Sequence, residues 1–531
     1  MGNVVQFLLR HFVGDEPRQH AMAFERARDA ASAEAPQMSL AEIKRELAGT
    51  DPVPMYELAD GSVLQVDRRI RRQHTCDFGS TGMGKSMNVA SALLDEFDRA
   101  CASLERSPER DDEVVPVEFR VVDVKSDTAI LLKKGIASRF LRASSRIRRA
   151  IARSCHAIEW REDAITPVPL LSDTGTSAEY EAELKADIIT RTSRQEWPET
   201  VRFLLFQLLR VARAVKVQPH PKWMSRVLRD AAARREIVSH IRALDLRDFL
   251  DRLETTVRPQ TIEAFERRIA IEFSFPAVHD STFIPYDDIV RLGVPLNAPI
   301  ILADCGSSQI PPSIGIARAN VLLTDIFFGA LRRDATIPLT VFIEEALLLL
   351  ANAPGLLQRV LDAIRVLRAR NTALKLAAQS VDTFPRAAMR ELVTNLGSIT
   401  AFQSRGDVAE ILAPHVSLPP GVPPRRGREA FERDLSSLKP RDAYFWVKGV
   451  PAIRVRSRFL VDPAKESGVP SDELLDIFDR EITPRSRIPV DTARKLIEDW
   501  EARTFGPQRP AARSGGENLR SFLGLDEGDD E

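Results

Sequence analysis

The sequence predicts an α/β protein with a mostly parallel sheet, an all-α insertion and helical terminal regions. Three observations support this prediction. Short apolar segments alternate with amphipathic helical patterns, which is typical of parallel sheets. A glycine-rich segment, GSTGMGKS, joins a strand pattern to a helical pattern at residues 79–86. Strand patterns are missing between about residues 175 and 285, where consecutive helical patterns follow one another.

The composition is that of a soluble globular protein with two or three domains. The chain has 531 residues, of which 44% are hydrophobic and 28% are charged. Its net charge of -1 means that any contact with DNA must be local, because no overall positive field is present. The 4 cysteines lie far apart without CxxC spacing, which argues against a disulfide framework or a zinc site.

No stretch of the sequence approaches the roughly 18 uninterrupted apolar residues that a membrane helix needs. The apolar N-terminal segment is short and is interrupted by Arg10 and His11. We therefore expect a cytoplasmic protein with no transmembrane segment of its own, which a partner protein would have to recruit to the inner membrane.

The first elements are predicted as follows. Residues 1–60 form a helical N-terminal region, in which MSLAEIKREL, residues 38–47, is a capped amphipathic helix. The first part of the core covers residues 61–174 and contains the glycine-rich segment, the helix after it and a strand at 117–124. An all-α insertion domain follows over residues 175–285.

The second part of the core is predicted over residues 286–460. Its strands are expected at 298–305, 339–346, 373–380 and 397–404, followed by a β-hairpin. Two C-terminal helices cover residues 461–504, and residues 505–531 form a disordered acidic tail.

GSTGMGKS fits the phosphate-binding pattern GxxxxGK[ST] at every fixed position. Gly79, Gly82 and Gly84 let the backbone curl so that its N–H groups point into a concavity. Lys85 then reaches the β- and γ-phosphates and Ser86 binds Mg²⁺, while the helix N-terminus adds positive potential. The residues predicted to contact ATP and Mg²⁺ are Gly79, Ser80, Thr81, Gly82, Met83, Gly84, Lys85, Ser86 and Met87.

The alternative interpretation of this segment is a Gly/Ser turn between a strand and a helix. The preceding strand, HTCDF, is more polar than a buried central strand usually is, and Asp77 has no obvious apolar neighbourhood.

VFIEEA, residues 341–346, is an apolar strand that ends in two carboxylates. Glu344 can hold the hydration shell of magnesium, and Glu345 can polarise the attacking water. The usual first residue is Asp, so the longer Glu344 implies a slightly retracted strand or a looser metal contact. The alternative is a strand that runs into a surface helix, but the apolar LLLL that follows favours a buried functional site.

AAQS ends the next strand, and Gln379 places a neutral amide where the γ-phosphate and the water would lie. An arginine-rich helical segment precedes this strand. Its residues Arg365, Arg368 and Arg370 are candidates for an arginine finger that acts in trans within a ring of subunits. The alternative for each arginine is a solvated helix face.

In their order, these motifs resemble the conjugative coupling proteins of type IV secretion, the VirD4/TraG-like group within the FtsK–HerA superfamily of DNA-pumping ATPases. The resemblance spans about residues 61 to 460. It is most specific where the acidic strand, the arginine-containing helix, the Gln-ended strand and the segment with Asn395 keep the family's order. Most coupling proteins also carry two N-terminal membrane helices, for which the sequence gives no signal.

The resemblance implies a RecA-like fold, a hexameric ring with ATP between subunits, and DNA in the central channel. It also implies that Gly79–Ser86 bind phosphate, that Glu344 and Glu345 serve metal and water, and that Gln379 senses the γ-phosphate. Asp123 and Lys125 match the family's D-x-K group, which implies only that they lie near the nucleotide.

The preferred hypothesis is ATP hydrolysis coupled to DNA translocation. One alternative is a HerA-type pump that acts with a nuclease in DNA repair or phage defence. Another is a nucleotide-gated recruitment platform with slow hydrolysis, to which the helical insertion and the acidic tail would bind a protein partner.

Three basic clusters, at residues 68–72, 146–153 and 425–428, are candidates for sequence-independent contact with the DNA backbone. A solvated surface is the alternative for each cluster. The sequence does not indicate whether the DNA is single- or double-stranded.

Overall fold

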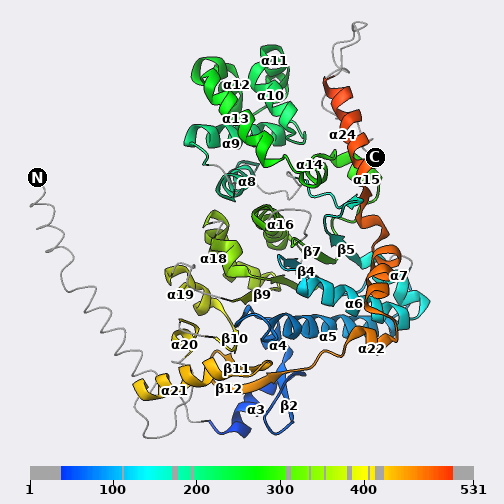
Figure 1. The fold of residues 1–531 in the computed structure, drawn as a ribbon, viewed down its shortest axis with the longest axis vertical. Coiled ribbons are helices and arrows are strands. Elements are labelled where there is room, and N and C mark those ends of the chain that lie inside the picture. The colour runs from blue at the N-terminus through cyan, green and yellow to red at the C-terminus, as the bar shows by residue number, and fades with distance from the viewer. Residues whose placement is uncertain are drawn as a thin grey trace, which may run out of the picture. The chain divides into compact units, whose positions relative to one another are not determined.

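The computed structural model describes residues 38–110, 113–169, 178–192, 196–306, 312–333, 336–351, 354–379, 386–404, 407–412 and 424–505. It is a mixed α/β structure, as predicted (Figure 1). The chain divides into two compact units. The first contains the residues up to Asn88, Ala378–Asp382 and Leu396–Phe459, and the second contains Val89–Ala377, Thr383–Asn395 and the residues from Leu460 onward.

The sheet of the first unit has a hairpin-rich, antiparallel part and one parallel pair. Its strands follow the order β2-β1-β12-β11-β10-β3. Only β10 and β3 pair in parallel, with Ile399 opposite Cys76. The bounds are Pro52–Glu57 (β1), Val63–Asp67 (β2), Thr75–Phe78 (β3), Ser398–Phe402 (β10), Asp442–Val447 (β11) and Val450–Ser457 (β12).

The predicted helical region over residues 1–60 is right in one part and wrong in another. Helix α3, Leu40–Ala48, starts at Ser39, which forms a capping box with Glu42, so the predicted capped helix is confirmed. Residues 52–57 instead form strand β1, because Pro54 cannot lie in a helix interior and the segment pairs with β2 and β12. Residues 1–37 lie outside the described residues.

The sheet of the second unit is parallel throughout, in the order β9-β8-β4-β7-β5. Its strands are buried on both faces, which explains their almost continuous apolar sequences. The predictions at 117–124, 298–305, 339–346 and 373–380 are confirmed as strands. The bounds are Glu118–Asp123 (β4), Cys155–Ile158 (β5), Ile300–Asp304 (β7), Leu339–Ile343 (β8) and Thr372–Ala378 (β9).

The sequence reasoning missed strand β5. It has only four residues, and His156 interrupts its apolar pattern. Because β5 pairs with β7 alone, it ends the order of strands given above.

Three helices supply much of the core of the second unit. Leu93 and Phe97 of α5 pack in one cluster with Leu132 and Ile136 of α6 and with Ile151 of α7. Helix α5 begins in the first unit and continues in the second. The bounds are Lys85–Glu105 (α5), Asp127–Arg142 (α6) and Ser145–Ser154 (α7).

Every described element between residues 178 and 291 is a helix, as the predicted all-α insertion requires. Helices α9 to α13 lie together as a cluster (Figure 1, green). The bounds are Ala178–Thr192 (α8), Glu199–Ala214 (α9), Pro221–Arg229 (α10), Ala231–His240 (α11), Leu244–Thr256 (α12), Pro259–Glu272 (α13), Pro276–Phe283 (α14) and Tyr286–Arg291 (α15).

Helix α16, Pro312–Arg332, is long and apolar enough to cross a membrane by length and composition. However, 71% of its apolar window is buried inside the fold, and the helix contacts α8, α18 and β4. Its apolar character is therefore that of a core helix.

Each of the remaining helices lies between two strands that follow one another in the sequence. Their bounds are Arg68–Arg71 (α4), Ala346–Ala351 (α17), Pro354–Ala369 (α18), Arg386–Asn395 (α19), Asp407–Leu412 (α20) and Pro424–Ser437 (α21).

The C-terminal segment of the second unit contains more than the two predicted helices. A π-helix over Phe478–Ile482 continues α23, and β13 pairs antiparallel with β6. The bounds are Pro463–Ser467 (α22), Ser471–Ile477 (α23), Ile488–Pro489 (β13), Val490–Phe505 (α24) and Ala164–Ile165 (β6). The predicted disordered tail lies outside the described residues from 506 onward.

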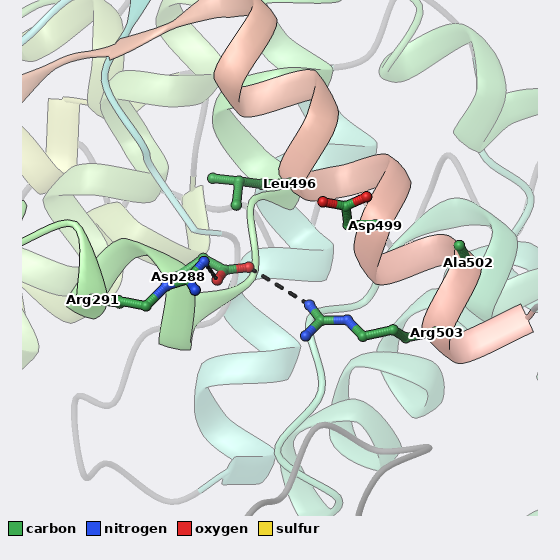
Figure 2. A pocket seen from close by; sticks show the side chains of 6 residues that line it. All are labelled: Asp288, Arg291, Leu496, Asp499, Ala502 and Arg503. Carbon is green, nitrogen blue, oxygen red and sulfur yellow. Dashed lines mark hydrogen bonds and ion pairs between the residues drawn. The ribbon is translucent and has the colours of Figure 1, made fainter.

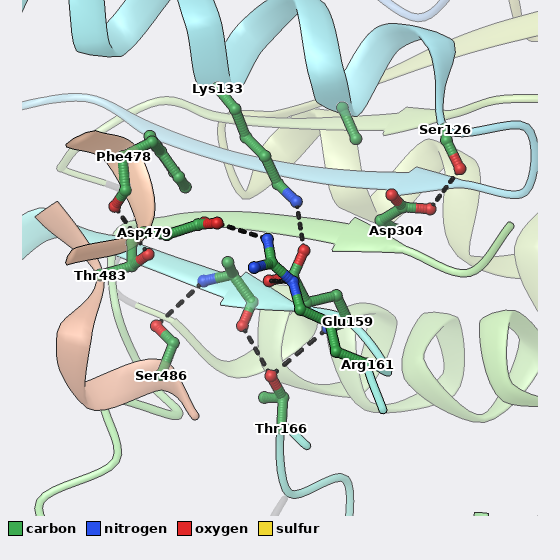
Figure 3. A network of polar contacts seen from close by, with 12 residues as sticks. Ser126, Lys133, Glu159, Arg161, Thr166, Asp304, Phe478, Asp479, Thr483 and Ser486 are labelled. Carbon is green, nitrogen blue, oxygen red and sulfur yellow. Dashed lines mark hydrogen bonds and ion pairs between the residues drawn. The ribbon is translucent and has the colours of Figure 1, made fainter. Parts of the chain in front are cut away.

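A network of buried charges fastens this segment to the end of β5 (Figure 3). The Lys133 ammonium donates to the Glu159 carboxylate at 2.6 Å. Arg161 and Arg487 both pair with Glu159 and with Asp479 of the π-helix. The neighbouring cations lower the pKa of Glu159 against the opposing effect of its burial. The carboxylates therefore tie the π-helix to the parallel sheet.

Candidate functional site

The glycine-rich segment is a loop between β3 and α5 that neighbouring strand ends hold in place. The N–H of Gly79 donates to the carbonyl of Ala378 at 3.1 Å, and the N–H of Ser80 donates to the carbonyl of Gln403 at 2.8 Å. Helix α5 begins at Lys85, as the predicted strand–loop–helix arrangement requires. The backbone of the loop is therefore fixed to the carbonyls of Ala378 and Gln403 within the first unit.

The predicted curl of the loop backbone is present. Gly79, Gly82 and Gly84 have positive φ angles of 154°, 77° and 108°. A Cβ atom at Gly79 would lie 2.7 Å from the Cβ of Phe402, so this position has no room for a side chain. Such a curled, glycine-lined loop at a helix N-terminus fits a phosphate group.

The Lys85 side chain lies within this loop. It is buried, and its ammonium donates to the carbonyls of Gly79 at 2.6 Å and Ser80 at 3.0 Å. A buried cation inside a cradle of backbone groups fits an anionic ligand. Thr81 and Gly82 are exposed at the loop tip, Met83 is buried, and Ser86 and Met87 are half-buried. Contact of these residues with ATP remains a prediction.

The structure explains the unusual polarity of strand β3. Asp77 is buried, and its carboxylate accepts a hydrogen bond of 2.9 Å from the side-chain amide of Asn88 in α5. Burial raises the pKa of the Tyr56 hydroxyl, and the charge of Asp77 adds to this effect. Tyr56 and Thr400 share a hydrogen bond of 2.7 Å between their hydroxyl groups. These side chains form one polar cluster, and Asn88 was not predicted as the partner of Asp77.

The two predicted catalytic glutamates lie at the carboxyl end of β8. Glu344 is 2% exposed and Glu345 is 7% exposed. The Thr128 hydroxyl donates to Glu344 at 3.3 Å, and the Lys125 ammonium donates to Glu345. Glu344 thus contacts the first turn of α6, and Glu345 contacts Lys125 in the segment that joins β4 to α6.

Asp123 has a structural task at this position. One of its oxygens accepts from the N–H groups of Lys125 at 2.8 Å and Ser126 at 3.0 Å. The other accepts from the N–H groups of Thr128 at 2.8 Å and Ala129 at 3.0 Å. Burial raises the pKa of Asp123, against the lowering effect of these bonds. Asp123 therefore caps the N-terminus of α6.

The sequence reasoning missed Thr128 and Asp304 as members of this site. Asp304 ends β7 and accepts a hydrogen bond of 2.6 Å from the Ser126 hydroxyl (Figure 3). A signal was present, because polar residues that follow neighbouring parallel strands meet at the same edge of the sheet.

Gln379 directly follows Ala378, whose carbonyl accepts the N–H of Gly79. Because of this bond, Gln379 lies next to the start of the glycine-rich loop. Its side chain is half-buried. The predicted arginine-finger residues lie on or just after α18. Arg368 and Arg370 are exposed, whereas the side chain of Arg365 lies outside the described residues. That any of them serves a neighbouring subunit remains a prediction.

Burial and ion pairs account for some arginines in two of the three basic clusters, and contact of the clusters with DNA remains a prediction. Arg71 is only 1% exposed, so it is not available for contact with DNA, whereas Arg69 and Arg72 are exposed. In α7, Arg146 pairs with Glu113 and Arg149 pairs with Glu109 at 2.9 Å. The side chains of the third cluster, residues 425–428, lie outside the described residues.

Among the described residues, no group of three or more His, Cys, Asp or Glu side chains is arranged to hold a metal ion. Magnesium commonly keeps water and phosphate oxygens as ligands and takes few from the protein. The predicted ligands Ser86 and Glu344 fit that mode, in which the nucleotide itself supplies ligands.

A separate hollow of about 500 Å³ lies between α15 and α24 (Figure 2). Its charges largely compensate each other, since Asp288 lies 2.6 Å from Arg291 and 3.9 Å from Arg503. Leu496, Asp499 and Ala502 complete the wall. We assign no chemistry to it.

Comparison with known proteins identifies the fold. No family model and no curated protein matches the chain. VirB4 of Thermoanaerobacter pseudethanolicus is similar over 78% of this chain and 98% of that chain, with 13% identity and a TM-score of 0.52. The plasmid coupling protein TrwB in complex with ADP and Mg²⁺ is similar over 80% of this chain and 95% of that chain, with 12% identity and a TM-score of 0.50.

The chain has the RecA-like fold of these proteins. The TrwB complex with a non-hydrolysable ATP analogue has the same TM-score of 0.50, at 13% identity. The predicted fold class is thus confirmed, and the resemblance to conjugative coupling proteins is confirmed at the level of the fold. The boundaries given to the individual domains remain a prediction.

Proposed function

We propose that the chain is an ATP-driven motor that translocates DNA, like a conjugative coupling protein. The observation that carries this proposal is the curled glycine-rich loop with the buried Lys85 ammonium inside it. The fold supports the proposal, because it is shared with TrwB, which has been solved in complex with ADP and Mg²⁺.

In this proposal the residues of the chain have distinct tasks. The loop N–H groups and Lys85 bind the triphosphate, and Ser86 and Glu344 orient a magnesium ion. The ion would neutralise charge on the phosphates. Glu345 accepts a proton from the attacking water, and Gln379 contacts the γ-phosphate.

The ring and the DNA are further parts of the proposal. We propose that the chain forms a homo-oligomer, a hexamer, in which Arg368 or Arg370 serves the nucleotide of a neighbouring subunit; both side chains are exposed and so available for this role. Because the net charge is only -1, we expect DNA contacts to be confined to a local surface such as the channel of a ring. We also propose a cytoplasmic location, with a partner protein for the helical insertion and the acidic tail.

The test is ATP turnover by the purified full chain, without DNA and with single- or double-stranded DNA. Lys85→Ala should abolish nucleotide binding and turnover. Glu345→Gln should keep nucleotide binding and lower kcat by about 100-fold or more, the usual contribution of a general base. Lys134→Ala is a matched control, because Lys134 lies on α6 outside the site.

If the purified chain hydrolyses ATP neither alone nor with single- or double-stranded DNA, the proposal of an ATP-driven motor is wrong. Tight ATP binding with negligible turnover, together with partner affinity that depends on nucleotide, would instead favour the recruitment platform.

A further inference from the structure

The segment from Lys125 to Thr128, which leads from β4 into the first turn of α6, contacts both glutamates of the acidic pair. Thr128 donates to Glu344 at 3.3 Å, and Lys125 donates to Glu345. These contacts come from one short segment, so a shift of this segment would change the surroundings of both carboxylates.

The backbone of this segment is held in a defined shape. Asp123 accepts four backbone N–H groups from the four residues Lys125, Ser126, Thr128 and Ala129. Ser126 adopts a left-handed φ of 71°, and its hydroxyl donates to Asp304 at 2.6 Å (Figure 3). The position of Lys125 is therefore set by the strand ends of β4 and β7.

Glu345 has an uncommon backbone conformation. Its φ is 50°, which lies in the left-handed region. This conformation is unfavourable in free energy for any residue other than glycine. Its side chain is 9% exposed, whereas that of Lys125 is 34% exposed. The lysine end of the ion pair can therefore leave toward solvent more easily than the glutamate end.

The ion pair matters for the chemistry proposed for Glu345. A carboxylate accepts a proton from water through a lone pair that faces the water. The Lys125 ammonium donates to one oxygen of the Glu345 carboxylate, Oε1, and so occupies a position that a water would otherwise approach. While this contact lasts, that oxygen is engaged with Lys125 instead of with the attacking water.

We propose that Lys125 acts as a latch: its ion pair with Glu345 keeps this carboxylate from acting as the base, and the ion pair must break before ATP is hydrolysed. This inference rests on the proposed function. Lys125 acts through Glu345 and is a positioning residue. Thr128 lies in the first turn of α6, and Asp123 accepts N–H groups from that turn. Movement of α6 would therefore also move the segment that carries Lys125, which is a route by which a ligand bound elsewhere could change turnover.

The first experiment tests the contact without any nucleotide. The full chain is treated briefly with an amine-acylating reagent, and modification of each lysine is measured by mass spectrometry. Since the Glu345 carboxylate covers the Lys125 amine, Glu345→Gln should raise the acylation rate of Lys125 about threefold or more, as expected for loss of a partly exposed ion pair. The rate of Lys134 in the same digest should stay unchanged. An unchanged Lys125 rate would overturn the latch, whatever the outcome for ATP hydrolysis.

The second experiment measures ATP turnover without DNA. Lys125→Met keeps the chain length but removes the charge, and it should raise kcat about fivefold with little change in KM, the factor expected from losing a weak ion pair. Lys125→Arg should keep the wild-type rate, because it keeps the ion pair. Lys134→Met serves as the control for loss of a nearby lysine.

The outcomes separate this inference from the proposed function. If wild-type protein hydrolyses ATP in a manner that depends on Lys85 and Glu345 but Lys125→Met is unchanged or slower, the latch is wrong and the motor stands. A slower, normally folded Lys125→Met would make Lys125 a group that assists catalysis directly. If the wild type hydrolyses no ATP, the proposed function fails, and the acylation result still decides whether the ion pair exists.

Discussion

The glycine-rich loop and the acidic pair are built in opposite ways. The loop is one contiguous segment, Gly79–Ser86, whose shape is defined by backbone torsions and backbone hydrogen bonds. The acidic pair is defined by side chains from separate segments, in which Asp123, Lys125 and Asp304 set the surroundings of Glu344 and Glu345. A site made from one segment leaves a fixed spacing in the sequence, whereas a site made from several segments leaves only scattered polar residues.

The largest loss of local stability is expected for Asp123→Asn, which changes the side-chain contacts around the acidic pair. The amide has one oxygen and a donor group, so two of the four backbone N–H groups lose their acceptor. Each buried donor without a partner costs about 1–3 kcal/mol, and we expect a loss of about 3 kcal/mol in local stability. Hydrogen exchange of the amides of residues 125–129 should rise by about 100-fold.

Asp127→Asn is the matched control for this variant. Asp127 is exposed in the first turn of α6, so its loss should cost about 0.5 kcal/mol. Equal effects of the two variants would show that Asp123 is not the cap of α6.

A somewhat smaller loss of stability is expected for Gly79→Ala, which changes the backbone of the glycine-rich loop. The added Cβ would lie 2.7 Å from the Cβ of Phe402, so the loop or β10 must shift. We expect a loss of about 2 kcal/mol in unfolding free energy and a loss of nucleotide binding. Denaturant unfolding and calorimetric titration with ATP measure the two effects. Wild-type affinity in this variant would mean that the loop does not need its backbone shape.

The smallest effect is expected for the pair Gly82→Ala and Gly61→Ala. Both glycines have a φ of 77°, and an added Cβ would meet no atom within 4 Å at either position. Each variant should therefore lose about 1 kcal/mol from the left-handed backbone alone. Only Gly82→Ala should also weaken ATP binding, because Gly61 lies in the turn between β1 and β2. Equal ATP affinities of the Gly82→Ala and Gly61→Ala variants would contradict the prediction that the glycine-rich loop contacts the nucleotide.

Most of the fold could be predicted because buried parallel strands have apolar runs that stand out from the helical patterns. Strand β5 escaped because it is short and contains His156, and β1 was assigned to a helical region although Pro54 argues against a helix. The acidic pair was predicted from its position after an apolar strand. Its contacts with Lys125 and Thr128 were not, because these residues lie 220 and 216 positions before their partners in the chain, and so distant a pair leaves no local pattern.

The charge network around Glu159 has a practical consequence for anyone who shortens this chain. Cutting after residue 460 would remove Asp479 and Arg487, and with them two of the charges that balance Lys133, Glu159 and Arg161. Buried ions that lose their partners are costly, and the pairing of β13 with β6 would disappear as well. A stable fragment of the second unit should therefore extend at least to Pro489.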